Sequence, residues 1–357
     1  MRKIVAMIMI CTLSLSMFSA CGAPQFEDLM IGINPRGIAG EHIGITDVSD
    51  AAVTDFAVRL FKASMKDGEN TLISPLSVLV ALSMTANGAD NETLTQMQNV
   101  LGMPIDQLNT WIHSYMENLP EADKYKLSLA NSIWFTDDER FTVNQDFLQT
   151  NADYYGADIY RAPFDDATCK DINKWVKDNT DGMIKNILDQ IPQEAVMYLI
   201  NALAFDAEWQ DIYFESQVRK GEFTTETGDV RDVDMMYSEE NKYLEDKHAT
   251  GFIKYYKDRK YAFAAFLPKE GTTVSEYIAP LDGEHLNELL TNAKSAFVNT
   301  SIPKFETEYD VEMSAVLSGM GMPDAFSGAT ADFSKLGHST AGNIFINRVL
   351  HKTFISV

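Results

Sequence analysis

Residues 195–205 have the sequence AVMYLINALAF, and this stretch decides the fold class. It contains eleven residues without a charged side chain, and apolar residues occupy both of its faces. Such a strand is typical of the centre of a large sheet that is covered on both sides. The chain is 357 residues long and 45% hydrophobic, which is sufficient to bury a sheet of this kind.

Further strand and helix segments surround this central strand. Residues 127–135 (LSLANSIWF) alternate in polarity and favour a half-buried strand. Shorter strand candidates are 221–225, 252–256, 261–267 and 296–302. Helical spacing of apolar residues predicts helices over 49–65, 75–86, 92–101, 171–178, 274–281 and 309–320. Helices followed by strands and helices mixed around one large sheet indicate an α+β architecture.

The helix expected after Ser74 has clear start and stop signals. Ser74 is a good N-cap residue, and Pro75 suits the first helical position. Asn87 and Gly88 provide the stop. Because this segment is apolar almost all round, we expect it to be a buried central helix.

The N-terminus has the pattern of a targeting segment. Arg2 and Lys3 precede an uncharged apolar stretch, 4–18, that is too short to span a bilayer comfortably. The sequence Phe18-Ser19-Ala20-Cys21 resembles a bacterial lipoprotein signal, in which the cysteine is acylated after cleavage. We therefore expect a signal peptide over 1–20, lipid attachment at Cys21 and a tether over 21–47. A secretory leader cleaved near Ala20, or a retained membrane helix, would be the alternatives.

Charge and cysteine content narrow the classes of partner. The formal net charge of −23, without a run of Lys or Arg, makes nucleic acid an unsuitable partner. Once Cys11 leaves with the leader and Cys21 carries lipid, Cys169 is the one remaining thiol, so no internal disulfide is expected. We expect an exported protein of the cell envelope, at the outer membrane or cell surface, or else a secreted one.

Eleven segments, in order along residues 50–357, resemble the serpin family of protease inhibitors. They are 70–78 (NTLISPLSV), 87–93 (NGADNET), 127–135 (LSLANSIWF), 172–185 (INKWVKDNTDGMIK), 199–209 (LINALAFDAEW), 233–236 (VDMM), 262–268 (AFAAFLP) with Gly271, 302–309 (IPKFETEY), 317–326 (LSGMGMPDAF), 331–336 (ADFSKL) and 351–354 (HKTF). Each is weakly specific alone, but their order and spacing match the family.

The resemblance implies a single serpin domain over 48–357, with three β-sheets and eight to nine helices. It also implies a suicide mechanism, in which a protease cleaves an exposed reactive loop and becomes acylated. The cut loop then inserts as a new strand into the large sheet, so the native fold must be metastable. The targets would be serine proteases or, in a minority of cases, cysteine proteases, and the inhibitor would be a monomer that needs no metal or cofactor.

The resemblance also implies roles for five residues. Ser74, Ser77, Asn201 and His351 match a polar cluster beneath the centre of the sheet, the shutter, where hydrogen bonds exchange as strands part. Trp209 matches the tryptophan at the top of the sheet, the breach, where insertion begins. Each position has a simpler interpretation: Ser74 as a helix cap, the other polar residues as satisfied core groups, and Trp209 as core packing.

The C-terminal stretch 344–357 (IFINRVLHKTFISV) is strongly strand-forming and remains apolar to its last residue. In the family, the strand containing His-Lys-Thr-Phe leads into a small-residue hinge, the reactive loop and further strands. Val357 precedes all of these, so the reactive-centre residue is absent from this chain. We expect a fragment of a longer product, with a naturally truncated, inactive serpin as the alternative.

Two other functions would compete with protease inhibition. An enzyme would require a catalytic group, but Cys169 lies in an acidic stretch that disfavours a thiolate, and the six histidines form no metal-binding pattern. We therefore expect no catalytic site. A non-inhibitory serpin acting as a binding or chaperone module is the second rival, and the absent hinge would distinguish it.

Overall fold

The computed structural model describes residues 26–38, 47–66, 68–119, 125–192 and 195–357. The expected signal peptide over 1–20 and Cys21 lie outside the described residues. Within them there are nine α-helices: α2 (Asp47–Ser64), α3 (Pro75–Ala86), α4 (Asn91–Leu101), α5 (Ile105–Glu117), α6 (Gln145–Tyr155), α7 (Asp166–Asn179), α8 (Val274–Ile278), α9 (Gly283–Thr291) and α10 (Ser314–Met320). None of these helices is both long and apolar enough to cross a membrane.

The described strands form three sheets. The large sheet has the order β1 (Glu27–Asp28), β4 (Asp158–Ala162), β2 (Tyr125–Thr136), β5 (Met197–Ala207), β13 (Arg348–Ser356) and β11 (Glu306–Glu312). The second sheet has the order β10 (Lys294–Pro303), β7 (Val230–Glu245), β8 (Ala249–Tyr255) and β9 (Ala262–Pro268), with β6 (Val218–Thr224) paired to β7. The third consists of β12 (Gly337–Ser339) and β3 (Phe141–Val143). The expected α+β architecture with three sheets and eight to nine helices is confirmed.

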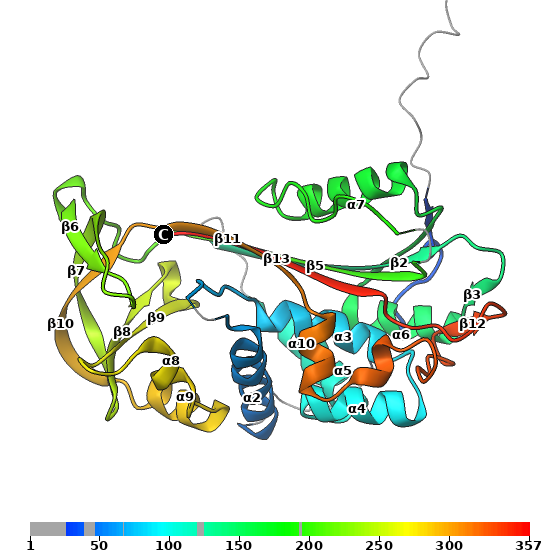
Figure 1. Cartoon of the computed structure of the whole chain (residues 1–357), viewed down its shortest axis with the longest axis horizontal. Coiled ribbons are helices and arrows are strands. Elements are labelled where there is room, and N and C mark those ends of the chain that lie inside the picture. Colours follow the sequence, from blue (N-terminus) through cyan, green and yellow to red (C-terminus); the bar gives the residue numbers. More distant parts are fainter. Residues whose placement is uncertain (1–25, 39–46, 67, 120–124, 193–194) are drawn as a thin grey trace, which may run out of the picture.

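The large sheet is covered on both faces, as the uncharged sequence of its central strand predicts. Figure 1 shows α7 on one face and α3, with most of the other helices, on the opposite face. Alternate residues of β5 enter the two cores: Met197 and Leu199 pack on the side of α3, whereas Tyr198 and Ile200 pack on the side of α7. Both faces of β5 are therefore buried over 197–202, and a charge on either face there would be costly.

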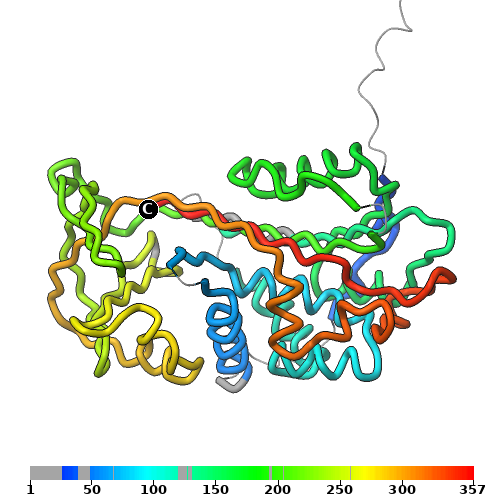
Figure 2. Tube along the Cα trace, in the orientation of Figure 1, coloured from blue at the N-terminus to red at the C-terminus, as the bar shows by residue number. Residues whose placement is uncertain are grey.

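The C-terminal strand β13 lies between β5 and β11. The conformation of β11 corrects the helix expected over 309–320. Figure 2 shows these segments, distant in the sequence, running side by side. We expected a helix over 309–320, but Glu306–Glu312 is a strand that pairs antiparallel with β13, and only Ser314–Met320 is helical. The partner strand decides this conformation, because its ladder satisfies the backbone of β11.

The longest strand of the second sheet was missed. Strand β7 carries several charged residues over Val230–Glu245, which weakens any alternating pattern. It forms a strand because β6 and β8 pair with its two ends and β10 pairs along its length. Long-range pairing here overrides a weak local signal.

The N-terminal segment corrects the expected tether. Residues 26–38 pack on the domain, and β1 adds an edge strand to β4. The Phe26 ring lies 5.3 Å from Trp134 and 5.0 Å from Tyr160, and the Arg36 guanidinium forms an ion pair with Asp153 at 2.7 Å. Apolar contact and a charged hydrogen bond fix this segment, so the folded unit includes it and does not begin at residue 48.

Candidate functional site

The start of α3 lies directly beneath the centre of the large sheet. Ser74 is the N-cap, and its Oγ accepts a hydrogen bond from the Ser77 backbone N–H at 3.5 Å, while Ser77 Oγ donates to the Ser74 carbonyl at 3.3 Å. Proline occupies the next position, as the sequence predicts. The Ser74 N–H, which has no partner within the helix, and the Ser77 carbonyl, which can accept a second bond, both face the sheet.

Asn201 on β5 and His351 on β13 are opposite each other in a parallel ladder. Their side chains point to the same face as Leu199 and Val349, which is the face that packs on α3. The Ser74 N–H donates to His351 Nε2 at 3.0 Å, so this nitrogen carries no proton. Nδ1 must then carry the proton, and it donates to Asn201 Oδ1 at 2.9 Å. This bond crosses directly between the two strands.

The Asn201 amide extends the network to a third strand. Its Nδ2 donates to the Ser77 carbonyl and to Asn131 Oδ1, the latter at 2.6 Å. Asn131 lies opposite Asn201 in the antiparallel ladder between β2 and β5. We call the five residues Ser74, Ser77, Asn131, Asn201 and His351 the polar cluster. The structure thus brings together the four residues predicted from the sequence; their role in sheet opening stays a prediction.

Sequence reasoning assigned no role to Asn131, although a signal for it was present. It shares a strand face with Ile133 and Phe135, both of which enter the core on the side of α3. A polar side chain on the core face of a strand requires a buried partner. That parity would have marked Asn131 for a place beside a buried polar group.

Burial controls the charge state of the polar cluster. Ser77, Asn201 and His351 are completely shielded from solvent. Desolvation lowers the pKa of His351 to about 4, so the imidazole is neutral at physiological pH. Neutral imidazole has one donor and one acceptor, and both are used here. The cluster therefore joins one helix and three strands without a buried charge.

Trp209 lies apart from the polar cluster, just beyond the end of β5. It is eight residues from Asn201, which corresponds to about 26 Å along an extended strand. Its indole stacks on Tyr256 with ring centroids 4.2 Å apart and an interplanar angle of 9°, and a β-bridge joins the two residues. These contacts support a packing role for Trp209. Its role in loop insertion stays a prediction.

Cys169 has the properties of a structural thiol. It is buried, and its Sγ lies 3.2 Å from the Leu188 carbonyl oxygen. Burial raises the pKa of the thiol, with nearby acidic residues acting in the same direction. A raised pKa leaves little thiolate, which a nucleophile or metal ligand requires.

Comparison with known proteins identifies the family to which this arrangement belongs. The family model described as "Serpin (serine protease inhibitor)" matches residues 51–357. The chain is a serpin. Leukocyte elastase inhibitor from Equus caballus is 30% identical to it over 328 residues, which cover 86% of this chain and 84% of that protein. Serpins inhibit proteases and are not catalysts, so this serpin is not an enzyme.

Two solved serpin structures clarify the conformation of the fold. The native state of tengpin, a thermophilic serpin, is 49% identical and superposes with a TM-score of 0.91, covering 93% of this chain and 86% of that chain. The latent state of tengpin superposes with a TM-score of 0.84 at 50% identity, covering 89% and 87%. The arrangement of this serpin is thus more similar to the native than to the latent form.

Proposed function

We propose that this protein is an inhibitory serpin, which traps serine proteases, or less commonly cysteine proteases, by inserting a cleaved loop between β5 and β13. The carrying observation is the hydrogen bond from His351 Nδ1 to Asn201 Oδ1, which crosses this strand pair at 2.9 Å. We call the paired stretch of β5 and β13, Tyr198–Ala202 with Arg348–Lys352, the seam. A new strand entering here would have to break that bond.

The contacts of the two side chains support a reversible opening. When the seam parts, His351 can keep its bond from the Ser74 N–H, which belongs to the rigid start of α3. Asn201 can keep its bonds to the Ser77 carbonyl and Asn131, and so remain attached to β2. Each side chain loses one hydrogen bond and keeps at least one other, so it stays attached to the elements on its own side of the seam. An inserted strand would restore the ladder bonds lost between β5 and β13.

Formation of a covalent complex tests this function. The protein expressed from the complete reading frame of its gene is incubated with trypsin-like, chymotrypsin-like, elastase-like and papain-like proteases. We expect at least one protease to form a complex that withstands denaturing electrophoresis, because the trapped acyl bond is covalent. Cleavage by all of them as a simple substrate would contradict inhibition and favour a binding or chaperone module.

We further propose that the protein is exported and anchored to the cell envelope through a lipid on Cys21. The support is the sequence Phe18-Ser19-Ala20-Cys21 after an apolar, positively flanked stretch. In the native host, we expect a labelled fatty acid to be incorporated and the protein to sediment with membranes. Cys21→Ser should abolish both, whereas Cys169→Ser, a change at a buried thiol, should preserve them. Unchanged labelling of the Cys21 variant would disprove the anchor.

A further inference from the structure

A short segment joins the large sheet to the second sheet. Residues 208–217 follow β5 and lead into β6, and we call them the inter-sheet link. Two backbone bonds attach its start to residues beside the end of β8: the Gln210 N–H donates to the Tyr255 carbonyl at 3.0 Å, and the Lys257 N–H donates to the Glu208 carbonyl at 2.8 Å. Any displacement of the end of β5 must therefore act on the link.

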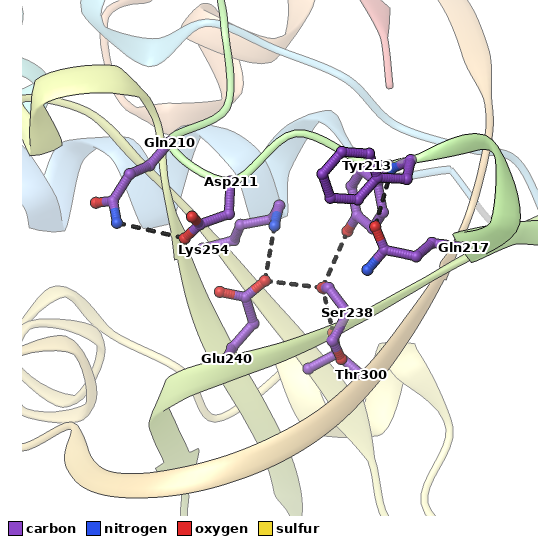
Figure 3. Close-up of polar contacts among 9 residues, drawn as sticks. Gln210, Asp211, Tyr213, Gln217, Ser238, Glu240, Lys254 and Thr300 are labelled. Atoms are coloured by element: carbon purple, nitrogen blue, oxygen red, sulfur yellow. Dashed lines mark hydrogen bonds and ion pairs between the residues drawn. The ribbon is translucent and has the colours of Figure 1, made fainter.

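A buried ion pair lies beneath this link (Figure 3). Lys254 Nζ on β8 is 2.7 Å from Glu240 Oε1 on β7, and the two side chains are only 1% and 10% exposed. Lysine is almost never fully buried without a partner, because desolvating an ammonium is costly. An apolar side chain could occupy this buried position without the cost of desolvating a charge. The presence of a charged pair therefore requires a physical reason.

Hydroxyl groups connect the ion pair to the link. Ser238 Oγ donates to Glu240 Oε1 at 2.8 Å and contacts Thr300 Oγ1 on β10 at 2.9 Å. Since the Ser238 proton is used on the carboxylate, the Tyr213 hydroxyl is the donor in its 3.3 Å bond to Ser238 Oγ. The network thus runs from the link, through β7, to the ammonium of Lys254 (Figure 3).

The Lys254 ammonium also contacts the aromatic rings of the link directly. It lies 4.6 Å from the centroid of the Tyr213 ring and 5.5 Å from that of Trp209. Cation–π attraction is strongest when the cation is desolvated, as it is here. Lifting the link would separate both rings from the Lys254 ammonium and so lose this attraction.

The end of β5 depends on this attachment more than its centre does. Among the described residues, the ladder to β13 ends at Ala202 and Lys352, although β5 continues to Ala207 and β13 to Ser356. Residues 203–207 are paired to β2 on their other side. Where this ladder is missing, the link and the contacts of the Phe205 ring with Tyr256 and Tyr261 attach the end of β5 to residues beside β8 and β9.

We propose that Lys254 is a positioning residue for sheet opening: its ion pair with Glu240 holds the inter-sheet link on the second sheet and so restrains the end of β5. This inference rests on the proposed insertion between β5 and β13. The ion pair would limit how often the end of the seam opens before the protein encounters a protease. Loss of the pair would make the end of β5 open more often, without a comparable effect on distant helices.

Native-state hydrogen–deuterium exchange of the full-length protein measures this opening and requires no protease. We expect Lys254→Met to accelerate exchange of residues 203–213 by about tenfold or more, because it leaves a buried carboxylate unpaired. Exchange in α2 should change by much less. Lys254→Met/Glu240→Gln, which removes both charges and keeps an acceptor for Ser238, should recover part of the protection.

Two further variants keep the result interpretable. Lys220→Met breaks an exposed ion pair to Asp234 in the same sheet and should leave the exchange unchanged. Tyr213→Phe removes one hydroxyl without burying a charge, and should accelerate exchange of the link by a few-fold even if Lys254→Met fails to fold. Equal acceleration in the link and in α2, or none in either variant, would overturn the proposal. The protease assay decides separately whether the protein inhibits.

Discussion

Replacing Asn201 by alanine should lower the free energy of unfolding by about 3–5 kcal/mol, because three groups lose a hydrogen bond at once. These are the His351 Nδ1–H, the Ser77 carbonyl and Asn131 Oδ1. Alanine supplies no hydrogen-bonding group, and Asn201 is completely buried, so water cannot readily replace the amide. Equilibrium unfolding in urea measures the loss as a lower transition midpoint.

Asn299→Ala provides the matched control for this change. Asn299 lies on β10 in the second sheet and is exposed, so the same substitution there should alter stability by about 0.5 kcal/mol or less. A loss at Asn201 no larger than that at Asn299 would show that the polar cluster contributes little. It would also remove the physical basis for a hydrogen-bonded link across the seam.

Acidification should destabilise the protein through His351, by about 3 kcal/mol between pH 6.5 and pH 4. The pKa of His351 is lowered from 6.5 to about 4 by burial. Between these values the unfolded chain binds a proton that the folded protein excludes, so stability rises with pH in this window. Above pH 6.5 the imidazole is neutral in both states, and its contribution to the pH dependence vanishes.

Comparison with His351→Gln isolates this effect from the carboxylates. Several acids have lowered pKa values in the folded state, among them Asp138 at about 2 and Asp153, and they also destabilise the protein as the pH falls. Their contributions are common to both proteins and cancel in the difference. We expect urea unfolding at a series of pH values to give a shallower slope for the variant. Equal slopes for the two proteins would mean that the pKa of His351 is not lowered in the folded state.

Structural features were predicted correctly where the signal for them came from residues close together in the sequence. The Ser74-Pro75 start of α3 was correct because a cap and its helix are neighbours in the chain. Strand β5 was placed at the centre of the sheet because eleven uncharged residues fit few other environments. The expected helix over 309–320 was wrong for residues 309–312, which belong to strand β11 because pairing with β13 decided their conformation.

The candidate sites show the same division. The polar cluster was anticipated through the family resemblance, yet the part played by Asn131 was not. Lys254 gave no signal, because a lysine in a strand normally faces water, and Glu240 lies 14 residues away on another strand. Its burial becomes evident only when the link, β7 and β8 are placed together.

The sequence by itself determined which segments are apolar, where helices start, and which polar residues interrupt apolar runs, because short-range sterics and burial preferences govern these features. The tertiary structure alone decided which of those polar residues meet. His351 and Asn201 are 150 residues apart in the chain, and Asn201 and Asn131 are 70 apart. Their hydrogen bonds depend on strand order and register, which arise from the packing of the whole sheet and are not encoded in any local pattern.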